Sequence, residues 1–115
     1  MLKEILNKFL ILNGVQAAIV IQENGEIIES MKSGIVIDRN LRTALSAIMT
    51  DTKSAATGFD SASLSMVFAE YSDKFLILGP LAEEFFLVVI AKSTANIGQI
   101  SYEMRKNQEA IVSLL

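Results

Sequence analysis

The sequence contains no cysteine, no histidine and no tryptophan, and it has one proline among 115 residues. Without cysteine, disulfides, zinc–thiolate sites and thiol nucleophiles are all excluded. Without histidine, the chain lacks the usual general base near neutral pH and the commonest transition-metal ligand. Catalysis would therefore need a defined group of carboxylates, lysines or tyrosines.

No such group stands out in the sequence. Glu83 and Glu84 follow Gly79-Pro80, and Glu23 and Glu26 flank Asn24-Gly25. Carboxylates beside turns are typical of solvated positions. Gly98 has no Gly-rich loop or Lys-Ser/Thr pair around it, so it does not indicate a phosphate site, and we expect it to pack closely against the sheet. We therefore expect a protein that is not an enzyme, with no cofactor and no metal.

Charge and hydrophobicity exclude two further classes. The net charge is −3, and the ten lysines and arginines are scattered, so the basic surface needed for nucleic-acid binding is missing. The longest apolar run, residues 85–91, is far short of the ~20 residues that span a bilayer, which argues against membrane insertion. No signal peptide is recognisable, so we expect a cytoplasmic protein. Half of the residues, 51%, are hydrophobic, which favours a protein–protein interface.

Hydrophobic periodicity predicts eight elements in one domain, residues 1–115. An amphipathic helix over 2–12 ends at Asn13-Gly14, and strands at 15–22 and 27–30 flank Asn24-Gly25, a hairpin turn in which both residues need a positive φ. Asp38 caps a helix to about 57; strands follow at 61–71, 74–78 and 85–91, and Ser93 or Thr94 caps a last helix whose buried side includes Ile97, Ile100, Met104, Ile111 and Leu115. Residues 85–91 are apolar on both faces, so helices should cover both sides of a five-stranded antiparallel sheet. The fold class is α+β, with the order αββαβββα.

The middle helix has an unusual second face. Its sheet-facing arc is expected to hold Leu41, Ala44, Leu45, Ile48, Met49, Thr52, Ala55 and Ala56. On the opposite side, small residues recur at helical spacing, namely Thr43, Ala47, Thr50 and Ser54, with Arg42, Asp51 and Lys53 beside them. This small-residue face is either a solvent face rich in Ser and Thr or a close contact with a second helix.

The strand expected at 61–71 presents a similar choice. Alternation places Leu64, Met66 and Phe68 on one face. At the edge of a sheet, the stretch from Ser63 to Val67 would carry no Lys, no Pro and no other guard against pairing. A second copy of the strand is the simplest partner for such an edge.

Three stretches together resemble the Roadblock family, which includes a dynein light chain and the MglB-like regulators of a small GTPase. They are Gly14–Val20 leading to Asn24-Gly25, the Ala/Ser/Thr-rich helix from Leu41 to Thr57, and Ala95–Ile100, with Asn96 and Gly98 in the family's motif. The family often has an arginine after that last motif, where this chain has Ser101, so any role of that arginine is not carried over. The resemblance covers essentially the whole chain and implies a profilin-like sandwich.

The resemblance also implies a dimer of this chain, or of this chain and a similar one. Third strands would pair across a two-fold axis into a ten-stranded sheet, with the middle helices side by side. The expected dimer interface comprises Thr43, Ala47, Thr50, Asp51, Ser54, Ser63, Leu64, Ser65, Met66, Val67 and Phe68. The expected partner-binding residues are Arg42, Ser46, Lys53 and Thr57.

Three functions are compatible with these features. The leading hypothesis is a non-enzymatic dimeric adaptor that binds a small Ras-like GTPase and regulates or scaffolds it. The alternative is a structural dimeric subunit of a larger motor or trafficking complex, without a GTPase contact. A small-molecule sensor would need polar groups converging on a pocket, and the inward-facing strand residues are almost uniformly apolar.

Overall fold

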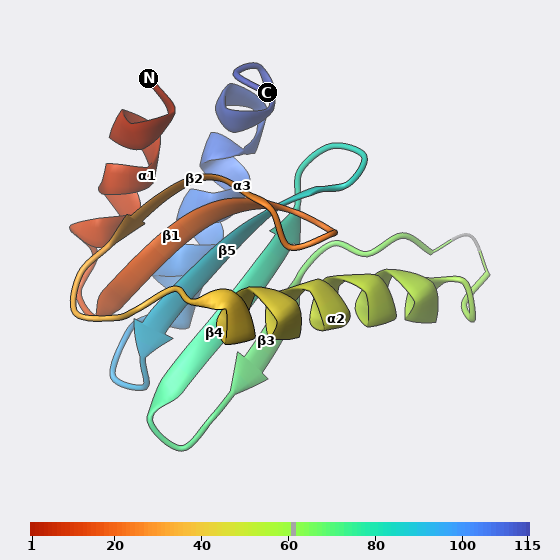
Figure 1. The fold of residues 1–115 in the computed structure, drawn as a ribbon, viewed down its shortest axis with the longest axis horizontal. Helices are drawn as coiled ribbons and strands as arrows, with labels where there is room; N and C mark the ends of the chain where they lie inside the picture. The colour runs from red at the N-terminus through yellow and green to blue at the C-terminus, as the bar shows by residue number, and fades with distance from the viewer. Residues whose placement is uncertain (61) are drawn as a thin grey trace.

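The eight expected elements are all present in the computed structural model, which describes residues 1–60 and 62–115 (Figure 1). In chain order they are α1 (Leu2–Leu10), β1 (Val15–Gln22), β2 (Ile27–Lys32), α2 (Arg39–Ala56), β3 (Val67–Glu70), β4 (Lys74–Pro80), β5 (Phe85–Lys92) and α3 (Ile97–Val112). The strands form one sheet in the order β2-β1-β5-β4-β3, and all neighbours are antiparallel. The predicted α+β class and the order αββαβββα are confirmed.

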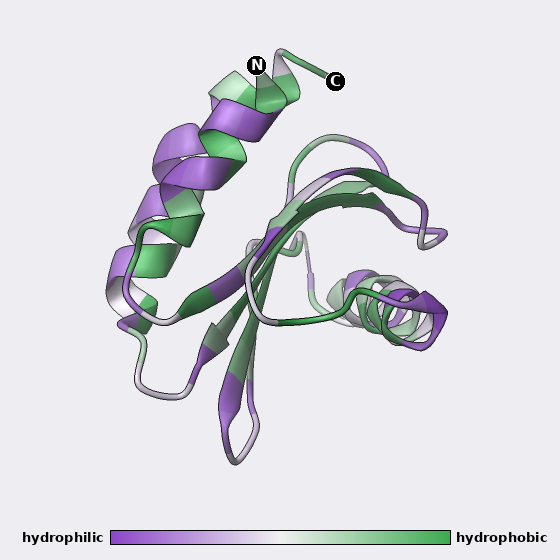
Figure 2. Ribbon diagram, turned by 60° about the vertical axis from the view of Figure 1, so that its left-hand side comes forward, coloured by the Kyte–Doolittle hydropathy of each residue, from purple (hydrophilic) through white to green (hydrophobic). Residues whose placement is uncertain are grey.

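The sheet lies between two layers of helices. Figure 2 shows α1 and α3 on one side of it and α2, seen nearly end-on, on the other. The central strands β1 and β5 bury both of their faces, as their apolar sequences predict. Val20 and Val89 pack in the cluster below α1 and α3, whereas Ile19 and Val88 pack in the cluster below α2. The sheet therefore has two separate apolar cores.

The turn between β1 and β2 lies where the Asn-Gly pair predicts it, but its geometry differs. Gly25 has φ +94°, whereas Asn24 does not have a positive φ. The amide of Gly25 donates to the carbonyl of Gln22, and the Asn24 side chain accepts from the amide of Glu26 at 2.9 Å. This is a type I turn followed by a left-handed glycine, a three-residue loop rather than a two-residue one. The expectation of a positive φ at Asn24 was wrong.

Helix α2 begins as predicted, because the Asp38 carboxylate accepts from the amide of Leu41 at 2.9 Å. Its rotation about its own axis was predicted less well. Leu45 and Met49 are fully buried, but Ala44 and Ala55, which were expected to face the sheet, are exposed. The buried arc is therefore narrower than the apolar arc of the sequence.

Strand β3 is shorter than predicted and begins only at Val67; Ser61, the start of the expected strand, lies outside the described residues. Pro80 gives a physical reason. The main-chain carbonyl of Lys74, the first residue of β4, accepts from the amide of Tyr71, just after β3, whereas the amide of Leu81, just after β4, donates to the carbonyl of Phe85 in β5. The even-numbered residues of β4 therefore direct their main-chain amides toward β3. Pro80 has no N–H to offer there, and the ladder ends at the Val67–Leu78 pair.

The last helix also begins differently. Asn96, and neither Ser93 nor Thr94, caps α3 by accepting from the amide of Gln99 at 3.0 Å. Gly98 is exposed, and a Cβ there would meet the capping oxygen of Asn96 at 3.3 Å, so the expectation that it packs against the sheet was wrong. Ile100, Met104 and Ile111 are buried as predicted. Leu115 is 41% exposed, contrary to expectation.

Candidate functional site

One side of α2 is held against the β1–β2 turn. The Ser46 hydroxyl donates to the main-chain carbonyl of Glu23, and the Lys53 ammonium forms a 3.1 Å ion pair with the Glu23 carboxylate. A Cβ on the buried Gly25 would lie 3.3 Å from the carbonyl oxygen of Arg42, and this tight approach together with the φ of +94° favours glycine here. Glu23 is therefore a structural contact, not the solvated turn residue that was expected.

These contacts bear on the predicted partner-binding residues. Three of them lie half-buried beside the turn, namely Arg42, Ser46 and Lys53. Ser46 and Lys53 already have hydrogen-bond partners within the chain. Arg42 lines a shallow hollow of about 320 Å³ together with the turn residues Asn24 and Gly25. Thr57 is exposed at the C-terminal end of α2, where its hydroxyl donates to the carbonyl of Ser54. The structure thus separates Thr57 from the other three.

The second side of α2 points away from the sheet, and we call it the outward face. It holds the predicted small-residue set, Thr43, Ala47, Thr50 and Ser54, all exposed. Asp51 is exposed beside them. The side chains are short, so this surface is smooth and uncharged apart from Asp51.

The third side of α2 faces strand β3, and we call it the β3 side. It consists of Leu41, Ala44, Ile48, Thr52 and Ala55, spaced at three and four residues. Two hollows open along it. Toward the start of the helix lies a groove of about 500 Å³, which reaches Tyr71 and Phe75 of the β3–β4 hairpin. Toward the end lies a hollow of about 300 Å³, which reaches the segment 62–66.

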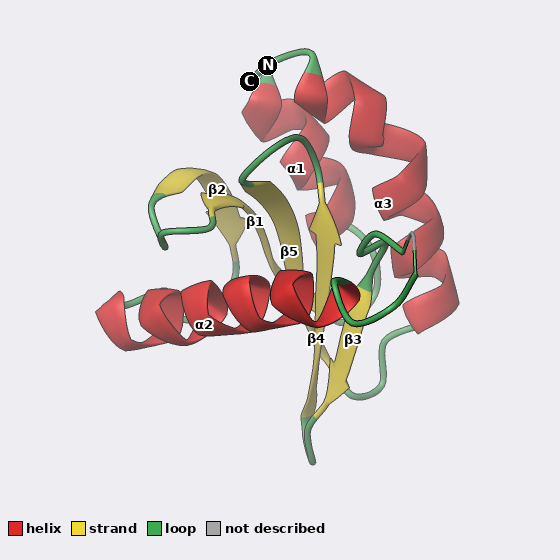
Figure 3. Cartoon of the chain, turned by 90° about the vertical axis from the view of Figure 1, so that its right-hand side faces the viewer, coloured by secondary structure: helices red, strands yellow, loops and turns green. Residues whose placement is uncertain are grey.

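The segment before β3 runs beside the sheet without joining it (Figure 3). Leu64 packs against the core below α2, whereas Met66 packs against the core below α1 and α3. The expectation that Leu64 and Met66 share a face was therefore wrong. Val67 packs on the α2 core, Phe68 is 51% exposed, and Ser63 and Ser65 are exposed.

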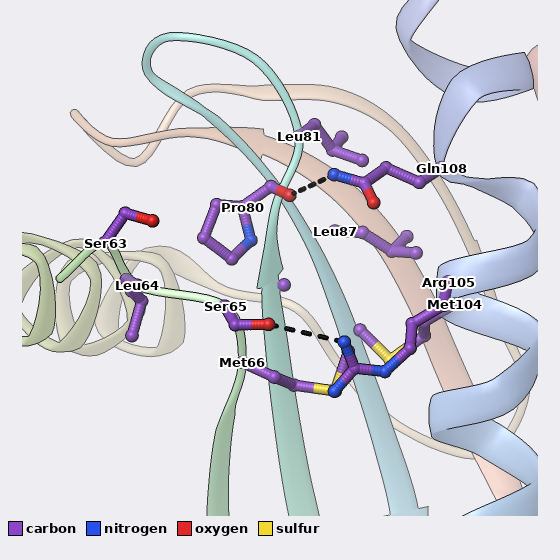
Figure 4. A pocket seen from close by; sticks show the side chains of 11 residues that line it. Ser63, Leu64, Ser65, Met66, Pro80, Leu81, Leu87, Met104, Arg105 and Gln108 are labelled. Atoms are coloured by element: carbon purple, nitrogen blue, oxygen red, sulfur yellow. Dashed lines mark hydrogen bonds between the residues drawn. The ribbon is translucent and has the colours of Figure 1, made fainter.

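Two side chains of α3 contact this segment and the end of β4. Figure 4 shows the hollow between them, about 310 Å³ in volume. The Arg105 guanidinium donates to the Ser65 hydroxyl at 3.3 Å, and the Gln108 amide donates to the Pro80 carbonyl at 3.2 Å. The Pro80 carbonyl, which a longer β3 would have used, is thus satisfied by a side chain.

Nothing in the described ranges 1–60 and 62–115 assembles three or more carboxylate, His or Cys residues into a metal-binding group. Among the helices of that part of the chain, none is long and apolar enough to cross a membrane. The features left for function are the edge strand β3, the segment before it and the two accessible sides of α2.

Comparisons with known proteins identify the family of the chain. The Roadblock/LC7 domain family matches residues 1–91, and the chain belongs to that family. Members of the family are generally non-catalytic adaptors. No curated protein matches the chain in sequence.

Solved structures show the same fold at low sequence identity. Myxococcus xanthus MglB aligns with a TM-score of 0.87 at 15% identity, over 98% of this chain and 93% of that one. The gliding protein MglB from Thermus thermophilus aligns with a TM-score of 0.84 at 18% identity, over 98% and 87%. Schizosaccharomyces pombe profilin aligns with a TM-score of 0.66 at 12% identity, over 98% and 94%, so the fold is profilin-like.

Sequence reasoning missed three exposed apolar side chains around α2. Val36 is 74% exposed before the helix, Phe59 is 69% exposed after it, and Tyr71 is 52% exposed at the β3–β4 turn. All three lie in or next to turns, where periodicity carries no information. A count of large apolar residues in polar loops would have pointed to them.

Proposed function

We propose that this protein is a dimeric, non-enzymatic adaptor that binds a small Ras-like GTPase and regulates or scaffolds it. The observation that carries the proposal is the unfinished edge at β3. Only four residues of β3 are paired, and the outer side of this strand is open to another strand. The β3 side of α2 lies next to that edge and exposes Ala44 and Ala55.

In this proposal two copies join at β3 with their α2 helices side by side, as the Roadblock likeness implies. The segment 63–66 of each copy would extend the contact beyond one end of the paired β3 strands, so that the two copies together extend it at both ends. Short side chains on α2 allow the two helices to approach closely. Ile48, on the β3 side, lies at the middle of the helix, where a two-fold axis would cross it.

The outward faces of the two helices would then form one continuous surface for the GTPase. The sequence pattern placed Thr43, Thr50 and Ser54 in the dimer interface; because they point away from the β3 side, we propose instead that they belong to this surface, with Thr57 at each end. No inserted catalytic residue is assigned, so any effect on GTP hydrolysis would come from repositioning the GTPase's own switch loops.

Two arginine substitutions at exposed positions of the same helix test this arrangement. Ala55→Arg places a charge on the β3 side and should convert the dimer to a monomer in light scattering at micromolar concentration. Thr50→Arg places the same charge on the outward face and should leave the dimer intact. It should abolish nucleotide-dependent capture of a GTPase from lysate supplied with GDP or a GTP analogue.

A wild-type chain that is monomeric at micromolar concentration would contradict the dimer. Capture of a large subunit regardless of nucleotide would favour the alternative, a structural subunit of a larger complex. Circular dichroism of both variants should match the wild type, because both side chains point to solvent.

A further inference from the structure

Phe59 exposes an aromatic ring at the end of α2. It follows the last helical residue by three positions, and its amide donates to the carbonyl of Ala56, which fixes the backbone of the turn. The residue is 69% exposed although it borders the 300 Å³ hollow at that end of the β3 side. An aromatic ring left in water forgoes a large hydrophobic gain, so its position indicates a contact.

At the other end of the β3 side, the 500 Å³ groove is open and mostly apolar. Its lining includes Ile35 and Val36 before α2, Leu41 and Ile48 of α2, and Tyr71 and Phe75 of the β3–β4 hairpin. Val36 and Tyr71 are 74% and 52% exposed at its rim. Two aromatic residues in the wall can receive a further ring in an edge-to-face or offset arrangement.

Along the chain, the two features lie the same number of residues beyond the two ends of α2. Val36 precedes Arg39 by three residues, and Phe59 follows Ala56 by three residues. The 18 residues of α2 span about 27 Å at 1.5 Å per residue. When two such helices lie antiparallel across a two-fold axis, the end of each lies beside the start of the other. That arrangement brings Phe59 of one copy to the groove of its partner, twice per dimer.

We propose that Phe59 of each copy inserts into the Val36–Tyr71 groove of the other copy and anchors the dimer. This inference rests on the proposed dimer and adds its anchoring residue. A four-residue edge strand and a helix side whose exposed residues are Ala44 and Ala55 offer little apolar area, whereas stable dimers bury roughly 800 Å² on each partner. Buried aromatic anchors supply most of the binding energy in such interfaces.

The absence of cysteine from the chain allows a direct test by disulfide cross-linking. Two single-cysteine chains, Phe59→Cys and Val36→Cys, are mixed and exposed to a mild oxidant. A cross-linked heterodimer should form only in the mixture. Phe59→Cys alone should not cross-link, because the two Phe59 positions lie at opposite ends of the helix pair. Ile28→Cys, exposed on β2 at the far edge of the sheet, serves as the matched control for Val36→Cys and should not cross-link to Phe59→Cys.

A second measurement examines the energetics. Phe59→Ala should raise the dimer dissociation constant by about tenfold or more in analytical ultracentrifugation, since anchors of this type cost that much when truncated. Tyr102→Ala, an equally exposed aromatic position on α3, should leave the dissociation constant unchanged.

The outcomes separate the two proposals. A stable dimer without the Phe59–Val36 cross-link, or with an unchanged dissociation constant in Phe59→Ala, overturns the anchor and leaves the dimer standing. A wild-type monomer overturns both. A cross-link that forms equally with Ile28→Cys shows random collision and also overturns the anchor.

Discussion

The two faces of the sheet are covered to different degrees. On one face, α1 contributes two fully buried residues and α3 contributes four. On the other face, α2 is the longest helix of the described chain, yet of its 18 residues only Leu45 and Met49 are buried. The first face is a closed core. The second is held by a narrow contact along the β1–β2 turn and is left open beside β3, which is where we place the interactions with other chains.

The largest expected difference concerns one leucine on each face. Leu6 of α1 and Leu45 of α2 are both 0% exposed. Leu6→Ala should lower the free energy of unfolding by about 4 kcal/mol, whereas Leu45→Ala should lower it by about 2–3 kcal/mol. The loss is smaller where the surrounding side chains can move into the cavity that the substitution leaves. The hollows beside α2 leave the helix room to move inward. Urea unfolding at one fixed protein concentration measures both values, and equal losses would contradict the comparison.

A smaller effect is expected at the two helix caps. Asp38 and Asn96 make equivalent hydrogen bonds to the third helical amide, at 2.9 and 3.0 Å. Replacing either with alanine should cost about 1 kcal/mol. In α3 the loss should appear as reduced global stability, because three buried apolar residues tie the helix to the core. In α2 it should appear as faster amide exchange in the first turns alone. Amide exchange that rises equally across both helices would contradict the view that α2 is held less firmly to the sheet than α3.

The smallest effect is expected at the ion pair that joins α2 to the turn. The side chains of Lys53 and Glu23 are 38% and 25% exposed, so solvent screens the pair. Lys53→Met should cost about 0.5 kcal/mol, and 1 M salt should remove most of that difference. Lys8→Met, at an exposed position of α1, is the control and should change nothing measurable. A loss above about 1.5 kcal/mol would mean that this contact, rather than Leu45 and Met49, holds the helix.

The sequence predicted the elements and their order well because each depends on local signals. The Asn24-Gly25 turn, the Asp38 cap and the doubly apolar run of β5 are all visible within a few residues. The rotation of α2 was not predictable in the same way. A helical wheel ranks Ala44 and Ala55 with Leu45, but the contacts of Ser46 and Lys53 with Glu23, 23 and 30 residues away, hold the helix so that both alanines lie on the β3 side and are exposed.

The length of β3 was missed for a related reason. Alternation from Ser63 onward is a valid strand pattern, yet a ladder also needs a donor on the neighbouring strand, and Pro80 lies outside the window that the pattern uses. The exposed rings of Phe59 and Tyr71 were missed because residues in turns do not follow the hydrophobic periodicity of helices and strands. Their positions next to the two ends of α2 become apparent only in the three-dimensional structure.

The other edge of the sheet carries a consequence for how far assembly can proceed. Along β2, Val20 pairs with Glu29 and Ile21 pairs with Ile27, so Ile28 is an extra, unpaired residue in a bulge. A bulged edge with Glu29 and Lys32 is a poor template for another strand. In the proposed dimer, a two-fold junction at β3 would use the one regular edge of each copy. The assembly would then end at two chains, and a sheet that could otherwise grow into a fibre would become a closed particle with a defined stoichiometry.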